Sequence, residues 1–184
     1  MAASRSLFNA KINNMCRGIS ILKSRIRQEL FEQYELSRLI HRRHESAEEE
    51  LWFDYADRGV KQVILPVIHD GRLVIHEWGN RNSGGITRDS GGGKISKLPR
   101  TGWCKQESLD AGKWKWLHPE PVEIPANFGL EKGIWFQIIE GARGIVVHDE
   151  SGVPRVYMLT QPASHYYQVM TRHDRMPVLI GQSI

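Results

Sequence analysis

The chain of 184 residues has only two cysteines, no long apolar run, no internal repeat and no acidic residue in its first 28 positions. Two cysteines without a secretory signal do not make a disulfide framework, so we expect a reducing, cytoplasmic setting. No stretch approaches the roughly 18 apolar residues that a membrane helix needs, so we expect no membrane partner. With 40% apolar residues, the chain suffices for one domain with a single core.

Charge is distributed unevenly along the chain. Positions 1–28 hold six Lys/Arg and no acid, positions 29–57 hold nine acids against three bases, and positions 72–115 hold nine bases against four acids. Two basic regions around an acidic segment are compatible with a face that binds a polyanion. They are equally compatible with a solvated surface that happens to cluster charge, and the pattern alone does not decide between the two.

Apolar spacing predicts an α+β fold. Leu22, Ile26 and Leu30 recur every four residues, which predicts helix over 20–50 with a break near 43–46. After Gly59 the pattern changes to short β-rich runs, and Asp70-Gly71 predicts a tight hairpin between two of them. We therefore expect a helical N-terminal third on a largely antiparallel, β-rich body, with 15–184 as one domain and 1–14 as a disordered leader or extension. The expected strands are 63–69, 72–78, 113–117, 133–139, 144–147, 155–159 and 178–180, and a short helix is expected over 162–170.

Two sequence patterns that could indicate a ligand site do not match the motif they resemble. The Gly-Gly-Gly-Lys run at 91–94 lacks the earlier glycine and the following Ser or Thr of a phosphate-binding loop, so it predicts a flexible loop. The histidines have no third ligand at zinc spacing, so we expect no metal site and no cofactor. These histidines are His41, His44, His69 and His76.

The strongest chemical signal is a pair of segments at opposite ends of the chain. Met15-Cys16-Arg17-Gly18 would give an N-terminal cysteine if the chain were processed or initiated at Met15. Such a residue carries an amine and a thiol on adjacent carbons, and together they can condense with one aldehyde. The second segment, at 172–177, is Arg-His-Asp-Arg-Met-Pro and offers His173. Residues 1–14 are then a removed leader, a misplaced start or a weak targeting segment.

These segments resemble the SOS response-associated peptidase family. The family opens with Met-Cys-Gly-Arg, has a strand pair ending in Trp-Gly and a Pro-Ala-Asp-Gly-Phe-x-Glu-Trp element, and closes on His-Asp-Arg-Met-Pro-Val. Here Lys132 follows Glu131 where the family has tryptophan, and of the family's Asn-Ala-Arg-Ser-Glu element only Arg100 has a counterpart. The similar segments, in family order, are 15–18, 66–68 with 77–79, 123–131, and 159–163 with 171–179.

The resemblance implies a monomeric, nucleoid-associated repair factor that captures abasic sites in single-stranded DNA. It implies that Cys16 bonds to the sugar aldehyde, that Glu131 and His173 assist proton transfer, and that the same groups give a self-processing cysteine peptidase. Arg17, Arg100 and Arg175 would contact phosphates. Two alternatives remain open: a non-catalytic module that binds single-stranded nucleic acid, and a small interaction protein whose partner uses the acidic segment.

Overall fold

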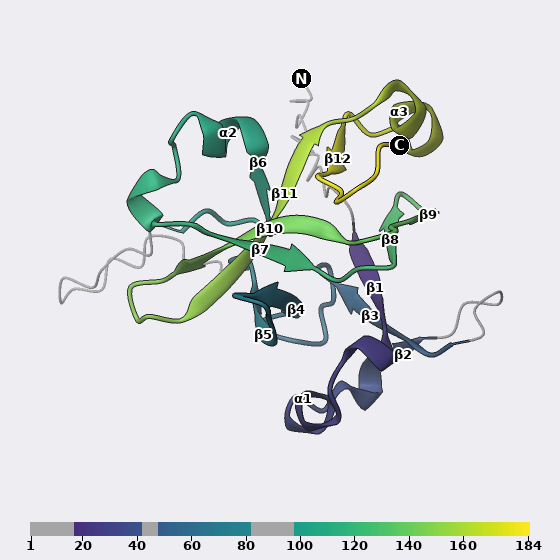
Figure 1. Cartoon of the computed structure of the whole chain (residues 1–184), viewed down its shortest axis with the longest axis vertical. Coiled ribbons are helices and arrows are strands. Elements are labelled where there is room, and N and C mark those ends of the chain that lie inside the picture. The colour runs from purple at the N-terminus through teal and green to yellow at the C-terminus, as the bar shows by residue number, and fades with distance from the viewer. Residues whose placement is uncertain (1–16, 42–47, 82–97) are drawn as a thin grey trace, which may run out of the picture.

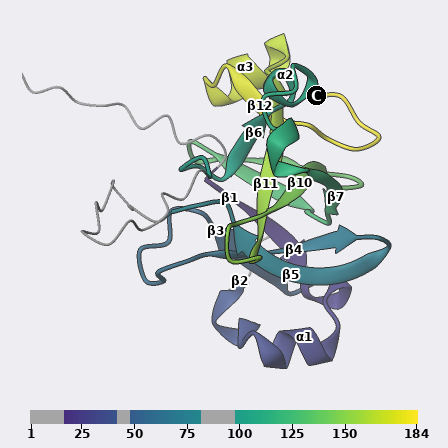
Figure 2. The same ribbon diagram turned by 90° about the vertical axis from the view of Figure 1, so that its left-hand side faces the viewer.

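The computed structural model describes residues 17–41, 48–81 and 98–184, which form two β-sheets with three short α-helices at their edges (Figure 1). Both views place α1 (Gln28–Gln33) at one end of the molecule and α2 (Gln106–Asp110) and α3 (His165–Thr171) at the other (Figures 1 and 2). Among the described residues, no helix is long and apolar enough to cross a membrane.

The first sheet has five antiparallel strands in the order β2-β3-β1-β8-β9. In β1, Ile19 and Ile21 point into the core and are fully buried, while Gly18 and Ser20 lie on the other face. Gly18 lies under the ring of Trp52, close enough that a Cβ there would lie 2.6 Å from it. The strands are β1 (Gly18–Leu22), β2 (Ile40–His41), β3 (Glu50–Asp54), β8 (Phe128–Glu131) and β9 (Ile134–Gln137).

The second sheet closes on itself. Its order is β10-β7-β4-β5-β11, and β11 pairs back with β10, which makes a five-stranded barrel. Two further strands, β6 and β12, pair with the outer part of β11. The pairings of β11 with β5 and with β6 are parallel. The strands are β4 (Ile64–His69), β5 (Arg72–Trp78), β6 (Trp103–Lys105), β7 (Glu120–Ile124), β10 (Ala142–His148), β11 (Pro154–Pro162) and β12 (Arg175–Pro177).

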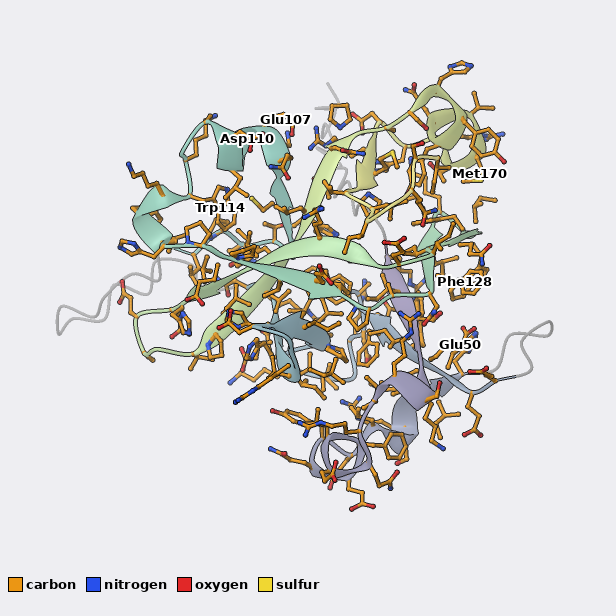
Figure 3. All side chains as sticks on the ribbon, in the orientation of Figure 1. Glu50, Glu107, Asp110, Trp114, Phe128 and Met170 are labelled. Atoms are coloured by element: carbon orange, nitrogen blue, oxygen red, sulfur yellow. The ribbon has the colours of Figure 1, made fainter. Side chains whose placement is uncertain are left out.

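Strands β10 and β11 are buried on both faces, which explains their nearly continuous apolar sequences. On one face, Val146 and Met158 belong to the main core that the barrel shares with the first sheet. On the other face, Ile145 and Tyr157 belong to a second cluster, where the Tyr157 ring packs edge-on against Trp114 with centroids 4.9 Å apart. Trp114 precedes the 3-10 helix η3 (Lys115–Leu117) on the outside of the barrel (Figure 3).

The expected α+β fold with a helical N-terminal third is wrong, because the chain is β-rich. Residues 18–22 and 50–54 are strands, and the helical turns between them are short: η1 (Lys23–Arg25), α1 and η2 (Leu36–Leu39). The four-residue spacing of Leu22, Ile26 and Leu30 is overridden by the alternation of Ile19 and Ile21, which pairs β1 with β3 and β8. Tertiary pairing therefore outweighs the local helical pattern here.

Other local predictions had mixed outcomes. The hairpin at Asp70-Gly71 is confirmed, with both turn residues at positive φ between β4 and β5. The predicted strand over 113–117 is wrong, since this segment forms a turn and η3. The predicted final strand is displaced toward the N-terminus, because β12 ends at Pro177 and only an isolated bridge joins Leu179 to Ala142.

Candidate functional site

Glu131 is the last residue of β8 and is fully buried. Its neighbour Leu130 pairs with Gly18 of β1, and the Leu130 carbonyl also accepts a hydrogen bond from the Arg17 backbone N–H at 2.9 Å. Arg17 directly follows Cys16 in the chain. The start of the described part of the chain is therefore hydrogen-bonded beside Glu131, although Cys16 and the leader 1–14 lie outside the described residues.

A two-residue turn follows Glu131 and leads into β9. Both turn residues are at positive φ, with 47° at Lys132 and 85° at Gly133. Glycine accepts this conformation freely, whereas a side-chain-bearing residue such as lysine loses about 1–2 kcal/mol in it. The Lys132 ammonium donates a hydrogen bond of 2.6 Å to the carbonyl oxygen of Arg172. This contact joins the β8–β9 turn to the segment that follows α3.

His173 lies in that segment and is 5% exposed. The preceding residue, Arg172, caps α3 in the left-handed conformation, with φ 56°. The Arg175 backbone N–H lies 3.0 Å from His173 Nδ1. The same Nδ1 also lies 3.1 Å from the Arg175 carbonyl oxygen, to which it can only donate. The first contact places the ring proton on Nε2 and the second places it on Nδ1. In either tautomer Nδ1 is engaged by the Arg175 backbone, and Nε2 is the ring nitrogen left for a ligand.

Helix α3 is held against the β8–β9 hairpin, and this packing sets the position of His173. The Ser164 hydroxyl caps the helix by accepting from the Tyr167 N–H at 3.0 Å. Tyr167 is fully buried, and its ring packs edge-on against Phe136 of β9 with centroids 5.2 Å apart. The segments that carry Glu131 and His173 are thus joined twice, by this aromatic contact and by the Lys132–Arg172 hydrogen bond.

The Arg175 side chain is already bonded within the protein, although the sequence predicted that it contacts a phosphate. Its guanidinium forms two hydrogen bonds to Glu107 of α2 and a third, of 2.7 Å, to the Thr160 carbonyl. The bonds from Arg175 hold the pKa of Glu107 at about 2, well below its usual value. Glu107 lies at the end of the molecule that also carries β12 (Figure 3). Contact between Arg175 and a phosphate remains a prediction that requires exchange of this partner.

Arginines from three segments lie around Tyr55. Arg17 is 62% exposed, pairs with Asp54 at 3.0 Å, and accepts the Tyr55 N–H on its carbonyl. The Arg81 guanidinium lies 6.0 Å from the centre of the Tyr55 ring. Burial raises the pKa of Tyr55 to about 12, against the lowering effect of the Arg81 and Arg100 charges. Sequence reasoning named Arg17 and Arg100 but missed Arg81, which no motif marks.

The second cysteine does not compete with Cys16 as a nucleophile. Cys104 is a free thiol, 1% exposed, on β6. Burial raises its pKa to about 12, and the charges of Asp110 and Glu107 act in the same direction. A thiolate, the reactive form, is therefore strongly disfavoured at Cys104.

The residues that the structure describes contain no group of three or more His, Cys, Asp or Glu side chains placed to hold a metal ion. His44 and the Gly-Gly-Gly-Lys run at 91–94 lie outside those residues.

The chain matches no family model, no curated protein and no solved structure.

Proposed function

We propose that this protein captures abasic sites in single-stranded DNA through Cys16, once Cys16 is the N-terminal residue. The observation that carries the proposal is that Glu131 and His173 lie on two adjoining segments. Both are buried, and they lie on segments joined by the Lys132–Arg172 hydrogen bond. Arg17, the residue after Cys16, is hydrogen-bonded beside Glu131. The chain neighbours of all three predicted catalytic residues are thus in contact.

The chemistry requires an amine and a thiol on one residue. An abasic sugar opens to an aldehyde, and the α-amine of Cys16, with an ordinary pKa of about 7.7–8.0, is partly neutral at pH 7. The amine adds to the aldehyde carbon and water leaves, which gives an imine. The thiol then adds to the same carbon and its proton passes to the nitrogen, which closes a thiazolidine ring. Ring closure is intramolecular, and this favours it over attack by a free thiol.

The buried acid and the imidazole have separate roles in this scheme. Glu131 carries protons to the departing water and away from the thiol. His173, with Nδ1 engaged by the Arg175 backbone, forms a hydrogen bond through Nε2 to a hydroxyl of the open sugar. This division of roles needs one carboxyl group and one imidazole on neighbouring segments, and it needs no metal.

The same groups would expose the N-terminal cysteine. The Cys16 thiol attacks the carbonyl carbon of Met15, the acyl group moves from nitrogen to sulfur, and water hydrolyses the thioester. The products are the released leader and a free α-amine on Cys16. We propose this self-processing step as the peptidase activity of the chain.

The arginines around Tyr55 are proposed to bind the DNA backbone. Arg17, Arg81 and Arg100 come from three segments, and Arg17 lies next to the reactive residue in the chain. Backbone contacts make affinity fall with salt, by a slope that scales with the number of phosphates bound. Replacing Arg100 or Arg81 with Ala should therefore weaken binding to any sequence and make the salt dependence shallower.

The deciding experiment combines intact mass with an abasic oligonucleotide. A mass that begins at Cys16, and a heat-stable protein–DNA adduct with loss of one water, support the proposal. Cys16→Ala should abolish the adduct and leave ordinary DNA binding intact, while the matched control Cys104→Ala should still form it. An adduct that survives Cys16→Ala would place the reacting group elsewhere.

A second function, a non-catalytic module for single-stranded nucleic acid, is favoured by one observation. The arginines around Tyr55 do not depend on Cys16 being N-terminal. This alternative predicts salt-dependent binding, a mass that still includes the leader, and no covalent product.

A further inference from the structure

Two residues with side chains sit in a backbone conformation that disfavours them, and they are hydrogen-bonded to each other. Lys132 and Arg172 have φ values of 47° and 56°, and the Lys132 ammonium bonds to the Arg172 carbonyl at 2.6 Å. Lys132 directly follows Glu131, and Arg172 directly precedes His173. Strained residues persist where the surrounding structure holds them, and they concentrate at functional sites.

The backbone conformation of the β8–β9 turn does not favour a lysine at position 132. Glu131 and Ile134 form the last pair of the hairpin, with Lys132 and Gly133 as its loop. Two-residue loops with both residues at positive φ favour Asn, Asp or Gly at the first position. A lysine at this position weakens the turn, so its contribution must come from its side chain.

The side chain makes a contact that the favoured turn residues are too short to make. The Lys132 stem spans from the hairpin to the C-terminal cap of α3, where the last carbonyls carry partial negative charge and attract a cation. The accepting carbonyl belongs to the peptide group whose nitrogen is that of His173. Moving this peptide moves the His173 ring relative to Glu131.

From these contacts we infer that Lys132 is a positioning residue, which fixes the buried Glu131 carboxyl group and the His173 imidazole relative to each other by holding the β8–β9 turn against the end of α3. The inference rests on the proposed function, because it assigns Lys132 to the same site. Lys132 need not touch DNA in this role.

The test uses Lys132→Gly, which removes the contact and also relieves the turn. Because glycine tolerates positive φ, the urea midpoint should stay the same or rise. The rate constant for capture of an abasic oligonucleotide should fall about 10- to 100-fold, as expected when catalytic groups are misplaced by about 1 Å. Affinity for an undamaged strand should not change. Lys132→Arg, which keeps a cation of similar reach, should restore most of the rate.

Glu35→Gly is the matched control, because Glu35 also has positive φ, at 49°, but lies between α1 and η2. It should change the urea midpoint in the same direction and leave capture unchanged. Three outcomes would overturn the inference. Capture by Lys132→Gly at the wild-type rate would remove Lys132 from the site. Joint loss of stability and capture would make it a structural residue. Loss of affinity for undamaged DNA would make it a DNA contact.

A separate readout keeps the inference testable if the wild-type protein forms no adduct. In that case the proposed function fails, but the imidazole signals of His173 in an NMR spectrum still report its surroundings. These signals should shift in Lys132→Gly and stay in place in Glu35→Gly. Unchanged His173 signals in Lys132→Gly would overturn the positioning role whatever the chemistry of Cys16.

Discussion

Arg175 and Glu107 form a bidentate ion pair that joins β12 to α2. Their two nitrogen–oxygen distances are 2.5 and 2.8 Å, and the same guanidinium also bonds to the Thr160 carbonyl of β11 at 2.7 Å. Strand β12 has only three residues, and it starts two residues after His173. The pair therefore stabilises the short strand that directly follows the candidate site.

Replacing Arg175 with Ala should destabilise the fold. The side chain is 13% exposed, so its loss leaves the Thr160 carbonyl without this donor and removes the link to α2. We expect a cost of about 1–3 kcal/mol, typical of a lost charge-assisted hydrogen bond. Urea unfolding measures it, and the exposed Arg143 replaced with Ala is the control. Equal stability of both variants would contradict a structural role for Arg175.

The same pair predicts a pH dependence of stability. Arg175 lowers the pKa of Glu107 from an ordinary 4.5 to about 2. A lowered pKa in the folded state contributes stability above pH 4.5, and this contribution is lost as pH falls toward 2. Glu107 is largely exposed, so solvent screening limits the effect to at most about 1 kcal/mol.

Glu107→Gln isolates this contribution. The variant should be slightly less stable than the wild type at pH 7, and the difference should shrink below pH 4.5 and vanish near pH 2. Urea unfolding at a series of pH values gives the comparison. A difference that stays constant across this range would mean that the Glu107 carboxylate does not stabilise the fold.

How far the sequence predicts this fold depends on which contacts form each element. The hairpin at Asp70-Gly71 was predictable because turn chemistry is local. The N-terminal third was not, since β1 becomes a strand by pairing with β8, which lies more than a hundred positions later in the chain. Closure of the barrel by the pairing of β10 with β11 cannot be predicted from a local sequence pattern either.

In the candidate site, too, the residues marked by a local motif were predictable and those placed by the fold were not. Motif resemblance named Glu131 and His173, and both are buried on adjoining segments. It did not identify the partner of Arg175, because Glu107 comes from α2 and has no motif of its own. Arg81 was missed because its position near Tyr55 follows from the fold alone.

The buried Cys104 thiol should be unreactive in the folded protein. Its pKa of about 12 leaves almost no thiolate at pH 8, and the side chain is 1% exposed. A thiol reagent such as Ellman's reagent should therefore label Cys16→Ala slowly under native conditions and rapidly in concentrated urea. Rapid native labelling would show that β6 opens readily, and Cys104→Ala separates labelling of Cys16 from this reaction.

Gly18→Ala should destabilise the protein and slow capture together. A Cβ at Gly18 would lie 2.6 Å from the Trp52 ring and would also meet the Phe53 backbone, so β1 must move away from β3. Overpacking of this kind costs about 1–3 kcal/mol. Because β1 is also paired with Leu130 beside Glu131, the same shift displaces the start of the described chain from the candidate site.

The matched control for Gly18→Ala is Gly59→Ala. Of the residues that the structure describes, its Cβ would meet within 4 Å only the end of the Asp57 side chain, which can move aside. Urea unfolding and the capture rate should both change in Gly18→Ala, and neither should change in Gly59→Ala. If Gly18→Ala unfolds at the wild-type midpoint, Trp52 and β3 move aside without loss of stability. The close packing of β1 on β3 then does not set the position of the residues beside Glu131.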